Sequence, residues 1–133
     1  MELPEMRGRA LTAVDASATP DQWLFQFGDG CFINVECDWR IVSTGRVVLA
    51  PKDHQQLFGR EEPVDAVKVI MSLLGGKNVT RASLGRAGDL VLEFDGTITL
   101  ETFTDSSGYE SCTIGLGNGK QLVVVGGGEV VEF

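Results

Sequence analysis

The sequence encodes the same β-hairpin twice. Residues 23–36 and 90–101 each contain an alternating apolar stretch, an Asp-Gly turn and a second alternating stretch that ends in glutamate. Alternation with a period of two is typical of a strand with one buried face, and Asp-Gly between two such strands is a strong hairpin signal. The repeat therefore predicts an architecture, and it does not by itself indicate a reaction.

Side-chain parity predicts the length of the turn in each copy. In the first copy a three-residue loop places Phe25 opposite Ile33, and in the second copy the same loop length places Leu92 opposite Leu100. A two-residue Asp-Gly loop would turn the apolar side chains of the second hairpin outward, because side chains alternate between the faces of a strand. The two copies then correspond at a constant offset of 67 residues.

The whole pattern predicts a single α+β domain over residues 1–133, dominated by antiparallel sheet. Strands are expected at 22–27, 31–37, 39–43, 46–50, 79–84, 89–94, 97–103, 109–116, 121–125 and 129–133. One helix is expected over residues 63–74, with Pro63 first, an apolar stripe that packs on a sheet face, and Gly75-Gly76 at its end. The helix joins two meander-like halves, a pseudo-repeat of about 22–50 and 89–125. The halves form either one sheet or two.

The charge of the chain limits its partners. The formal net charge is −8, and the sequence has no cluster of Lys and Arg, so neither nucleic acid nor an anionic membrane is expected to bind. Residues 84–133 carry eight carboxylates against Arg86 and Lys120, a local net charge of −6. This excess would steer a basic protein toward that half, although acidic side chains also serve simply to keep a surface soluble.

The cysteines and the N-terminus indicate a reducing compartment. Cys31, Cys37 and Cys112 are odd in number and lack a C-x-x-C spacing. Cys31 and Cys37 are expected on one strand, about 20 Å apart and too far to bridge, so all three are expected to be reduced. The N-terminal segment lacks the apolar core of a signal peptide, and no run approaches about 18 apolar residues, so we expect a cytoplasmic protein without membrane contact.

Catalytic motifs are weak. His54, the single histidine, lies beside Asp53 in a polar loop, where it is more typical of a solvated residue than of a Ser-His-Asp or Cys-His site. Residues 115–120 resemble a phosphate-binding loop, but Gln121 and a strand follow Lys120 where Ser or Thr and a helix are needed, so a β-turn is expected. We expect no catalytic residue, no metal and no cofactor.

Glutamates on the second hairpin form the main candidate surface. Glu93 and Glu101 are expected on its outer face as opposite neighbours, with Glu110 on an adjacent strand. Two like charges so placed repel unless water, a cation or a basic partner intervenes. Partner binding at Glu93, Glu101, Tyr109 and Glu110 is the main interpretation, and a glycosidase-like acid pair or a metal site is the alternative.

The second copy also carries a family resemblance. Its Leu-x-Leu-x-Phe-Asp-Gly pattern, the Tyr109-Glu110 pair and the Gly126-Gly127-Gly128 bend resemble a family of small bacterial proteins of unknown function, over roughly residues 20–133. In that family a Leu-x-Phe-x-Asp-Gly hairpin, a Tyr-Glu-x-Trp strand and a Gly-Gly bend recur, and here Cys112 stands where the tryptophan would be. The resemblance implies a β-rich fold without a known activity. Some such proteins resemble immunity proteins of bacterial toxin systems.

These observations favour a non-catalytic binding protein. The expected partner is a basic protein such as a toxin domain, with Tyr109 as anchor and Glu110 as charge. One rival is a small-ligand-binding module or assembly subunit that uses a cavity between the halves, and a second is an enzyme built on carboxylates. The sequence does not specify an oligomeric state.

Overall fold

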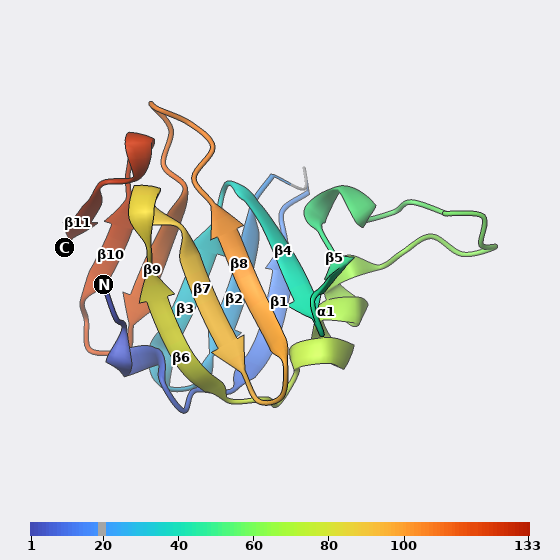
Figure 1. The fold of residues 1–133 in the computed structure, drawn as a ribbon, viewed down its shortest axis with the longest axis horizontal. Helices are drawn as coiled ribbons and strands as arrows, with labels where there is room; N and C mark the ends of the chain where they lie inside the picture. Colours follow the sequence, from blue (N-terminus) through green and yellow to red (C-terminus); the bar gives the residue numbers. More distant parts are fainter. Residues whose placement is uncertain (19–20) are drawn as a thin grey trace.

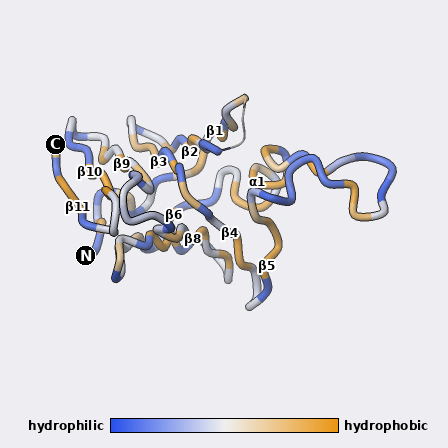
Figure 2. Tube along the Cα trace, turned by 90° about the horizontal axis from the view of Figure 1, so that it is seen from above, coloured by the Kyte–Doolittle hydropathy of each residue, from blue (hydrophilic) through white to orange (hydrophobic). Residues whose placement is uncertain are grey.

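The protein is a sandwich of two antiparallel sheets. The computed structural model describes residues 1–18 and 21–133, and Figures 1 and 2 show the two layers from the front and from above. The six-stranded sheet has the order β1 (Leu11–Ala16), β2 (Trp23–Phe27), β3 (Cys31–Val35), β9 (Cys112–Leu116), β10 (Gln121–Val124) and β11 (Val130–Glu132). The five-stranded sheet has the order β5 (Arg46–Leu49), β4 (Asp38–Ser43), β8 (Ile98–Phe103), β7 (Leu90–Phe94) and β6 (Val79–Leu84). The expected α+β class with mainly antiparallel sheet is confirmed.

The two copies of the hairpin lie in different sheets and face each other. The predicted pairs of Phe25 with Ile33 and of Leu92 with Leu100 are both present in the ladders. Phe27 and Phe94, which occupy corresponding positions in the two copies, stack across the sandwich with ring centroids 6.4 Å apart. Alternation buries one face of each hairpin because the other hairpin covers it.

The two halves exchange strands. After β3 the chain crosses through residues 36–37 to the opposite sheet, where β4 pairs with β8. After β8 it crosses back through residues 104–111, and β9 pairs with β3. The order β1-β2-β3-β9-β10 in one sheet thus corresponds to β6-β7-β8-β4-β5 in the other. The sequence predicts two separate meander-like halves. The structure differs, because each sheet takes strands from both halves.

The core lies between the sheets and is rich in aromatic side chains. Trp39 lies edge-on to Trp23 and to Phe25, with centroids 5.1 and 5.7 Å away, and all three side chains are buried. Edge-to-face packing is the preferred geometry of aromatic pairs. The space between the halves is therefore filled by side chains.

Three strand predictions need correction. β1 was not expected, because a bulge between Leu11 and Ala13 gives its burial a period of three instead of two. β9 begins at Cys112, so residues 109–110 lie in the connection that precedes it. β3 ends at Val35, so Cys37 lies in the crossover and not on the strand of Cys31. All three cysteines are free and buried, as expected.

The helix begins later than the sequence predicts. α1 spans Ala66–Leu74, and the Asp65 carboxylate caps it by accepting the Lys68 amide N–H at 3.3 Å. The amide of Ala66 donates to Nδ1 of His54 at 3.0 Å, and the His54 ring lies edge-on to Trp23. Val64 is paired with residues 55–56 by backbone hydrogen bonds, which keeps the predicted first turn extended. Long-range contacts thus set the start of the helix.

The helix closes one side of the sandwich instead of covering a sheet face. It contacts the edge strands β1 and β5, one from each sheet, as Figure 1 shows. The side chains at every fourth position, Ala66, Ile70 and Leu74, are fully buried there. None of the helices in the described residues, α1 included, could cross a membrane.

The N-terminal segment covers the edge of β6. The amide of Leu3 donates to the Ala82 carbonyl at 2.8 Å, and the amide of Leu84 donates to the Met1 carbonyl at 2.8 Å. Covering an edge strand in this way prevents it from pairing with another chain. β5, at the other edge of the same sheet, has no such cover among the described residues.

We predict that His54 stabilises the start of the helix. His54→Ala should lower the free energy of unfolding by about 1–2 kcal/mol, since the Ala66 amide loses its acceptor and Trp23 loses a ring contact. His54→Asn should lose less, because the Asn side-chain oxygen can accept the same hydrogen bond. Chemical denaturation of the three proteins measures the difference, and equal losses for both variants would refute a capping role.

We predict that Phe27 and Phe94 couple the two hairpins energetically. Phe27→Leu and Phe94→Leu should each lower the free energy of unfolding by about 1–2 kcal/mol. The double variant should lose less than the sum, by about 0.5–1.5 kcal/mol, because the stacked pair is already broken by either change. The control is a second double variant, which combines Phe27→Leu with Leu122→Val on β10, three strands away. Its loss in the free energy of unfolding should equal the sum of the two single losses. If the losses were additive in both double variants, the proposed coupling of Phe27 and Phe94 would be contradicted.

Candidate functional site

The four predicted site residues separate into two places. Glu93 and Glu101 lie on the outer face of the five-stranded sheet, on β7 and β8. Tyr109 and Glu110 lie in the connection between β8 and β9, at one end of the sandwich. The two places differ in their electrostatics, and only the second remains a candidate site.

Glu93 and Glu101 are not opposite each other. The ladder pairs Glu93 with Thr99 and Val91 with Glu101, in the same register that pairs Leu92 with Leu100. The expected direct repulsion between the two glutamates is therefore wrong. The predicted outer face and the predicted alternation of side chains are correct. Only the prediction that Glu93 and Glu101 lie directly opposite each other is wrong.

Each of these glutamates faces an arginine on the neighbouring strand. Glu101 accepts a hydrogen bond from Arg40 Nε at 2.9 Å, and its second oxygen accepts one from the Thr99 hydroxyl at 2.8 Å. On the other side Arg81 lies 3.9 Å from the Glu93 carboxylate and 2.9 Å from that of Glu2. Opposite charges across a ladder stabilise the sheet modestly. The negative charge of this face is therefore partly balanced, by Arg40 at Glu101 and by Arg81, which Glu93 shares with Glu2.

Four carboxylates gather at the end of the sandwich that carries Tyr109. An open pocket of about 500 Å³ is lined by Asp21, Glu36, Asp105, Tyr109 and Glu110, together with Gln22 and Ser106. They come from three connections, β1–β2, β3–β4 and β8–β9, which meet at the upper end of the view in Figure 1. We call Asp21, Glu36, Asp105, Tyr109 and Glu110 the acidic end.

Backbone contacts hold the crossover connections together. The amide of Glu36 donates to the Ser111 carbonyl at 2.8 Å, and the amide of Asp38 donates to a carboxylate oxygen of Asp105 at 3.3 Å. Within the longer connection the Ser106 hydroxyl accepts the amide of Tyr109 at 2.9 Å. The site is therefore built where the two halves exchange strands.

The carboxylates of the acidic end influence one another. Burial, followed by the charges of Glu110 and Asp21, raises the pKa of Glu36 above its ordinary value. None of Glu36, Asp105 and Glu110 takes part in an ion pair within residues 1–18 and 21–133. Tyr109 projects beside them with 82% of its surface exposed. Like charges and one aromatic side chain thus share an open surface.

The same end breaks the pseudo-symmetry of the fold. The connection from β3 to β4 has two residues, 36–37, whereas the corresponding connection from β8 to β9 has eight, 104–111. The longer connection supplies Asp105, Tyr109 and Glu110, and Ser106, which supports the backbone of Tyr109. Connections vary without disturbing a core, and binding residues concentrate in them.

The nucleophile candidates are held in structural roles. Burial raises the pKa of Cys37 to about 11 and that of Cys112 to about 12, so both remain thiols at neutral pH. Nδ1 of His54 is occupied by the Ala66 amide, and the ring packs on Trp23. Within the described part of the chain no three His, Cys, Asp or Glu side chains are arranged to hold a metal ion.

Sequence reasoning found two of the five residues of the acidic end. Tyr109 and Glu110 were visible as a pair of exposed types in the acidic half. Asp21, Glu36 and Asp105 are not predicted. Asp21 and Glu36 come together at the open end of the first hairpin, where Trp23 pairs with Val35, and the strand exchange adds Asp105 to them. The available signal was position, since Asp21 directly precedes an expected strand, Glu36 is the second-last residue of one, and Asp105 lies two residues after one.

Comparison with known proteins assigns the chain to a family whose function is unknown. No curated protein and no solved structure shows a significant match to the chain. One family, described as "Family of unknown function (DUF6188)", matches residues 3–133. The expected likeness to a family of unknown function is thereby confirmed, and the chain belongs to this family.

Proposed function

We propose that the protein is a binding protein without catalytic activity and that its acidic end engages a basic protein. The observation that carries the proposal is the crowding of Glu36, Glu110 and Asp21 beside the exposed Tyr109. Carboxylates in a soluble protein are usually spread apart or paired, as Glu93 and Glu101 are on the outer face. A basic side chain from a partner would relieve the repulsion at the acidic end.

The shape of the acidic end suits a protein better than a small molecule. The pocket is open and lies between loops, whereas small-ligand sites are concave and mostly apolar. Tyrosine is enriched at the centres of protein interfaces, because its ring supplies contact area and its hydroxyl a hydrogen bond. Surrounding carboxylates would speed association with a basic surface and select against acidic ones.

A toxin domain is the specific partner that we propose, in an immunity-type role in the cytoplasm. This step rests on the resemblance of such small acidic proteins to immunity proteins, together with the charge of −8. The carboxylate-based enzyme is the weaker candidate. In its acid pair Glu101 is bound by Arg40 and Glu93 lies 3.9 Å from Arg81, and the acidic end lies open to solvent.

Site-specific photocrosslinking tests the proposal directly. A photoreactive phenylalanine analogue at position 109 should capture one basic protein in the native cell, and the same analogue at Phe133, another exposed aromatic, should not. The captured protein should then bind the purified chain with an affinity that falls as salt is added. Capture of no protein, or of an acidic one, would refute the proposed function. If the product of a neighbouring gene is the captured protein, the immunity-type role gains support.

We predict that two substitutions separate binding from folding. Tyr109→Ala should weaken binding of the captured partner by about 2 kcal/mol, as is typical of an interface anchor, and leave the free energy of unfolding within about 0.5 kcal/mol. Glu110→Gln should weaken binding and reduce its salt dependence. The matched control is Asp95→Asn, which removes the same charge from the β7–β8 turn at the opposite end of the sandwich. Calorimetry with the captured protein measures all three, and equal losses for the control would contradict the site.

We predict that Glu36 destabilises the free protein at neutral pH. Since the pKa of Glu36 is raised in the folded state, the folded protein binds the proton more tightly than the unfolded chain does. The stability of the protein therefore falls as the pH rises from the ordinary pKa to the raised one. Glu36→Gln should therefore melt at a higher temperature than the native protein at pH 7. The difference should disappear as the pH falls below the ordinary value of 4.5, where both side chains are neutral. A native protein that is more stable than the variant at pH 7 would argue against crowding.

A further inference from the structure

An arm of residues 54–65 projects from the side of the sandwich between β5 and α1, as Figures 1 and 2 show. Its base is closed by hydrogen bonds from the Gln55 amide to the Val64 carbonyl at 2.7 Å and from the Val64 amide to the Gln56 carbonyl at 2.9 Å. Near its tip Leu57 and Phe58 are 51% and 65% exposed. Phe58 also has a φ of 46°, a left-handed conformation that bulky residues rarely adopt. The arm thus exposes two apolar side chains, of which Phe58 also lines the pocket at the base of the arm.

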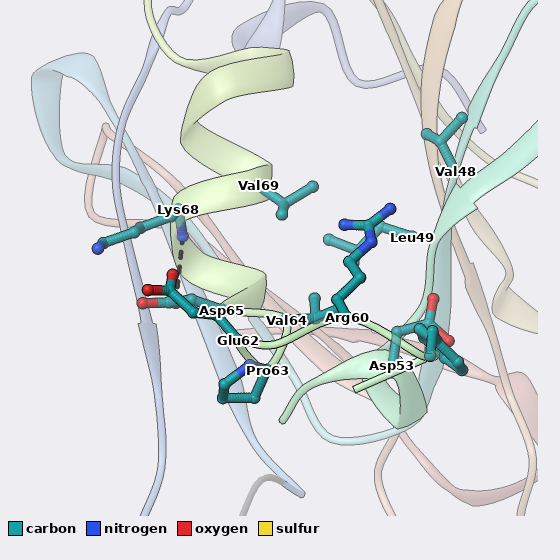
Figure 3. Close-up of a pocket in the computed structure, with 11 residues that line it drawn as sticks. Val48, Leu49, Asp53, Arg60, Glu62, Pro63, Val64, Asp65, Lys68 and Val69 are labelled. Atoms are coloured by element: carbon teal, nitrogen blue, oxygen red, sulfur yellow. Dashed lines mark hydrogen bonds between the residues drawn. The ribbon is translucent and has the colours of Figure 1, made fainter. Parts of the chain in front are cut away.

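A groove lies at the base of this arm. It is an open space of about 950 Å³ between β5, the arm and α1, with an apolar floor that includes Leu49, Val64 and Val69. Figure 3 shows the Arg60 side chain extending into this space between Val69 and Leu49. No carboxylate within the described residues forms an ion pair with Arg60. The groove is therefore lined by six apolar and five charged residues, and Arg60 is the cation that extends into it.

Exposed apolar side chains concentrate around the groove. Seven large apolar side chains are strongly exposed in the described residues, and four of them are Val47 and Val48 on β5 and Leu57 and Phe58 on the arm. β5 is also the sheet edge that the N-terminal segment leaves uncovered. Large exposed apolar patches mark interaction sites. We call Val48, Leu57, Phe58 and Val69 the arm surface; Val47 lines a separate pocket together with Arg40 and Phe103.

The charge around the arm surface differs from that of the rest of the molecule. Residues 46–69 carry four carboxylates and four basic side chains, a net charge of zero, so the remainder of the chain carries the whole −8. Lys68, Arg60, Glu61 and Glu62 take part in no ion pair within the described residues. A second copy of the chain would be repelled by most of the surface but not here. Unpaired charges of both signs suit a surface that binds itself.

We propose that the arm surface binds a second copy of this chain, with the arm of each copy in the groove of the other. The arm carries exposed apolar side chains and charges of both signs, and the groove is lined by the same two kinds of side chain, so the two are self-complementary and a twofold axis closes such a contact into a dimer. In this arrangement Arg60 of one copy meets Glu62 of the other, twice. The residues of the acidic end do not line the groove, so both acidic ends of the dimer stay open to partners.

Sedimentation velocity over a wide range of concentration tests the dimer. The native protein should dimerise, and Phe58→Asp should raise the dimer dissociation constant at least about tenfold. Phe133→Asp is the matched control, because Phe133 is similarly exposed but lies outside the arm surface, and it should leave the constant unchanged. Thermal melting checks that both variants fold. A native protein that stays monomeric, or a dimer that Phe58→Asp does not weaken, overturns the proposal.

Charge reversal tests the exchange of arms. Arg60→Glu and Glu62→Arg should each weaken self-association, because each places like charges in contact twice. A mixture of the two variants should form a heterodimer as stable as the native dimer, since both contacts then join opposite charges. Failure of the mixture to associate overturns the arrangement. A photocrosslinker at position 57 should give a covalent homodimer, and capture of a different protein in its place would show another occupant and refute self-association.

Discussion

Two ladders between the halves of the chain, β3 with β9 and β4 with β8, determine the rest of the structure. Each ladder joins a hairpin of one half to a strand of the other, so neither sheet exists until both halves are in place. The exchange puts the hairpins face to face, which buries their apolar sides and brings Phe27 against Phe94. It also sends both crossover connections over the same end of the sandwich, and this places the candidate site.

The pseudo-symmetry of the exchange separates scaffold from function. Corresponding strands repeat in the two sheets, and their side chains fill one core. Among the segments that the repeat does not account for are the long connection 104–111, whose counterpart has only two residues, and the segment 50–78, which carries the arm and α1. The first supplies the exposed tyrosine and two of the carboxylates of the acidic end, and the second supplies the exposed apolar arm. Additions that the core does not require are where a duplicated fold can acquire binding surfaces.

The parts of this structure that sequence could predict are those set by local parity. The pairs of Phe25 with Ile33 and of Leu92 with Leu100 follow from alternation and turn length alone, and both are correct. Alternation does not predict β1, because a bulge interrupts it, and it does not predict the start of the helix, because His54 and the paired arm fix that start from outside the helix. The arginines that face the outer glutamates lie on β4 and β6. Such neighbours depend on strand order, which hydrophobic pattern does not specify.

The contrast between the outer face and the acidic end bears on the meaning of the negative charge. If the carboxylates served solubility alone, the same arrangement would be expected on both surfaces. On the outer face Glu93 and Glu101 each have an arginine across the ladder, and the charges stabilise the sheet. At the acidic end, Glu36 is pushed toward its protonated form by burial and by its acidic neighbours. A surface that holds repelling charges lowers the stability of the free protein, and this cost is typical of binding sites, where the partner supplies the compensating charge.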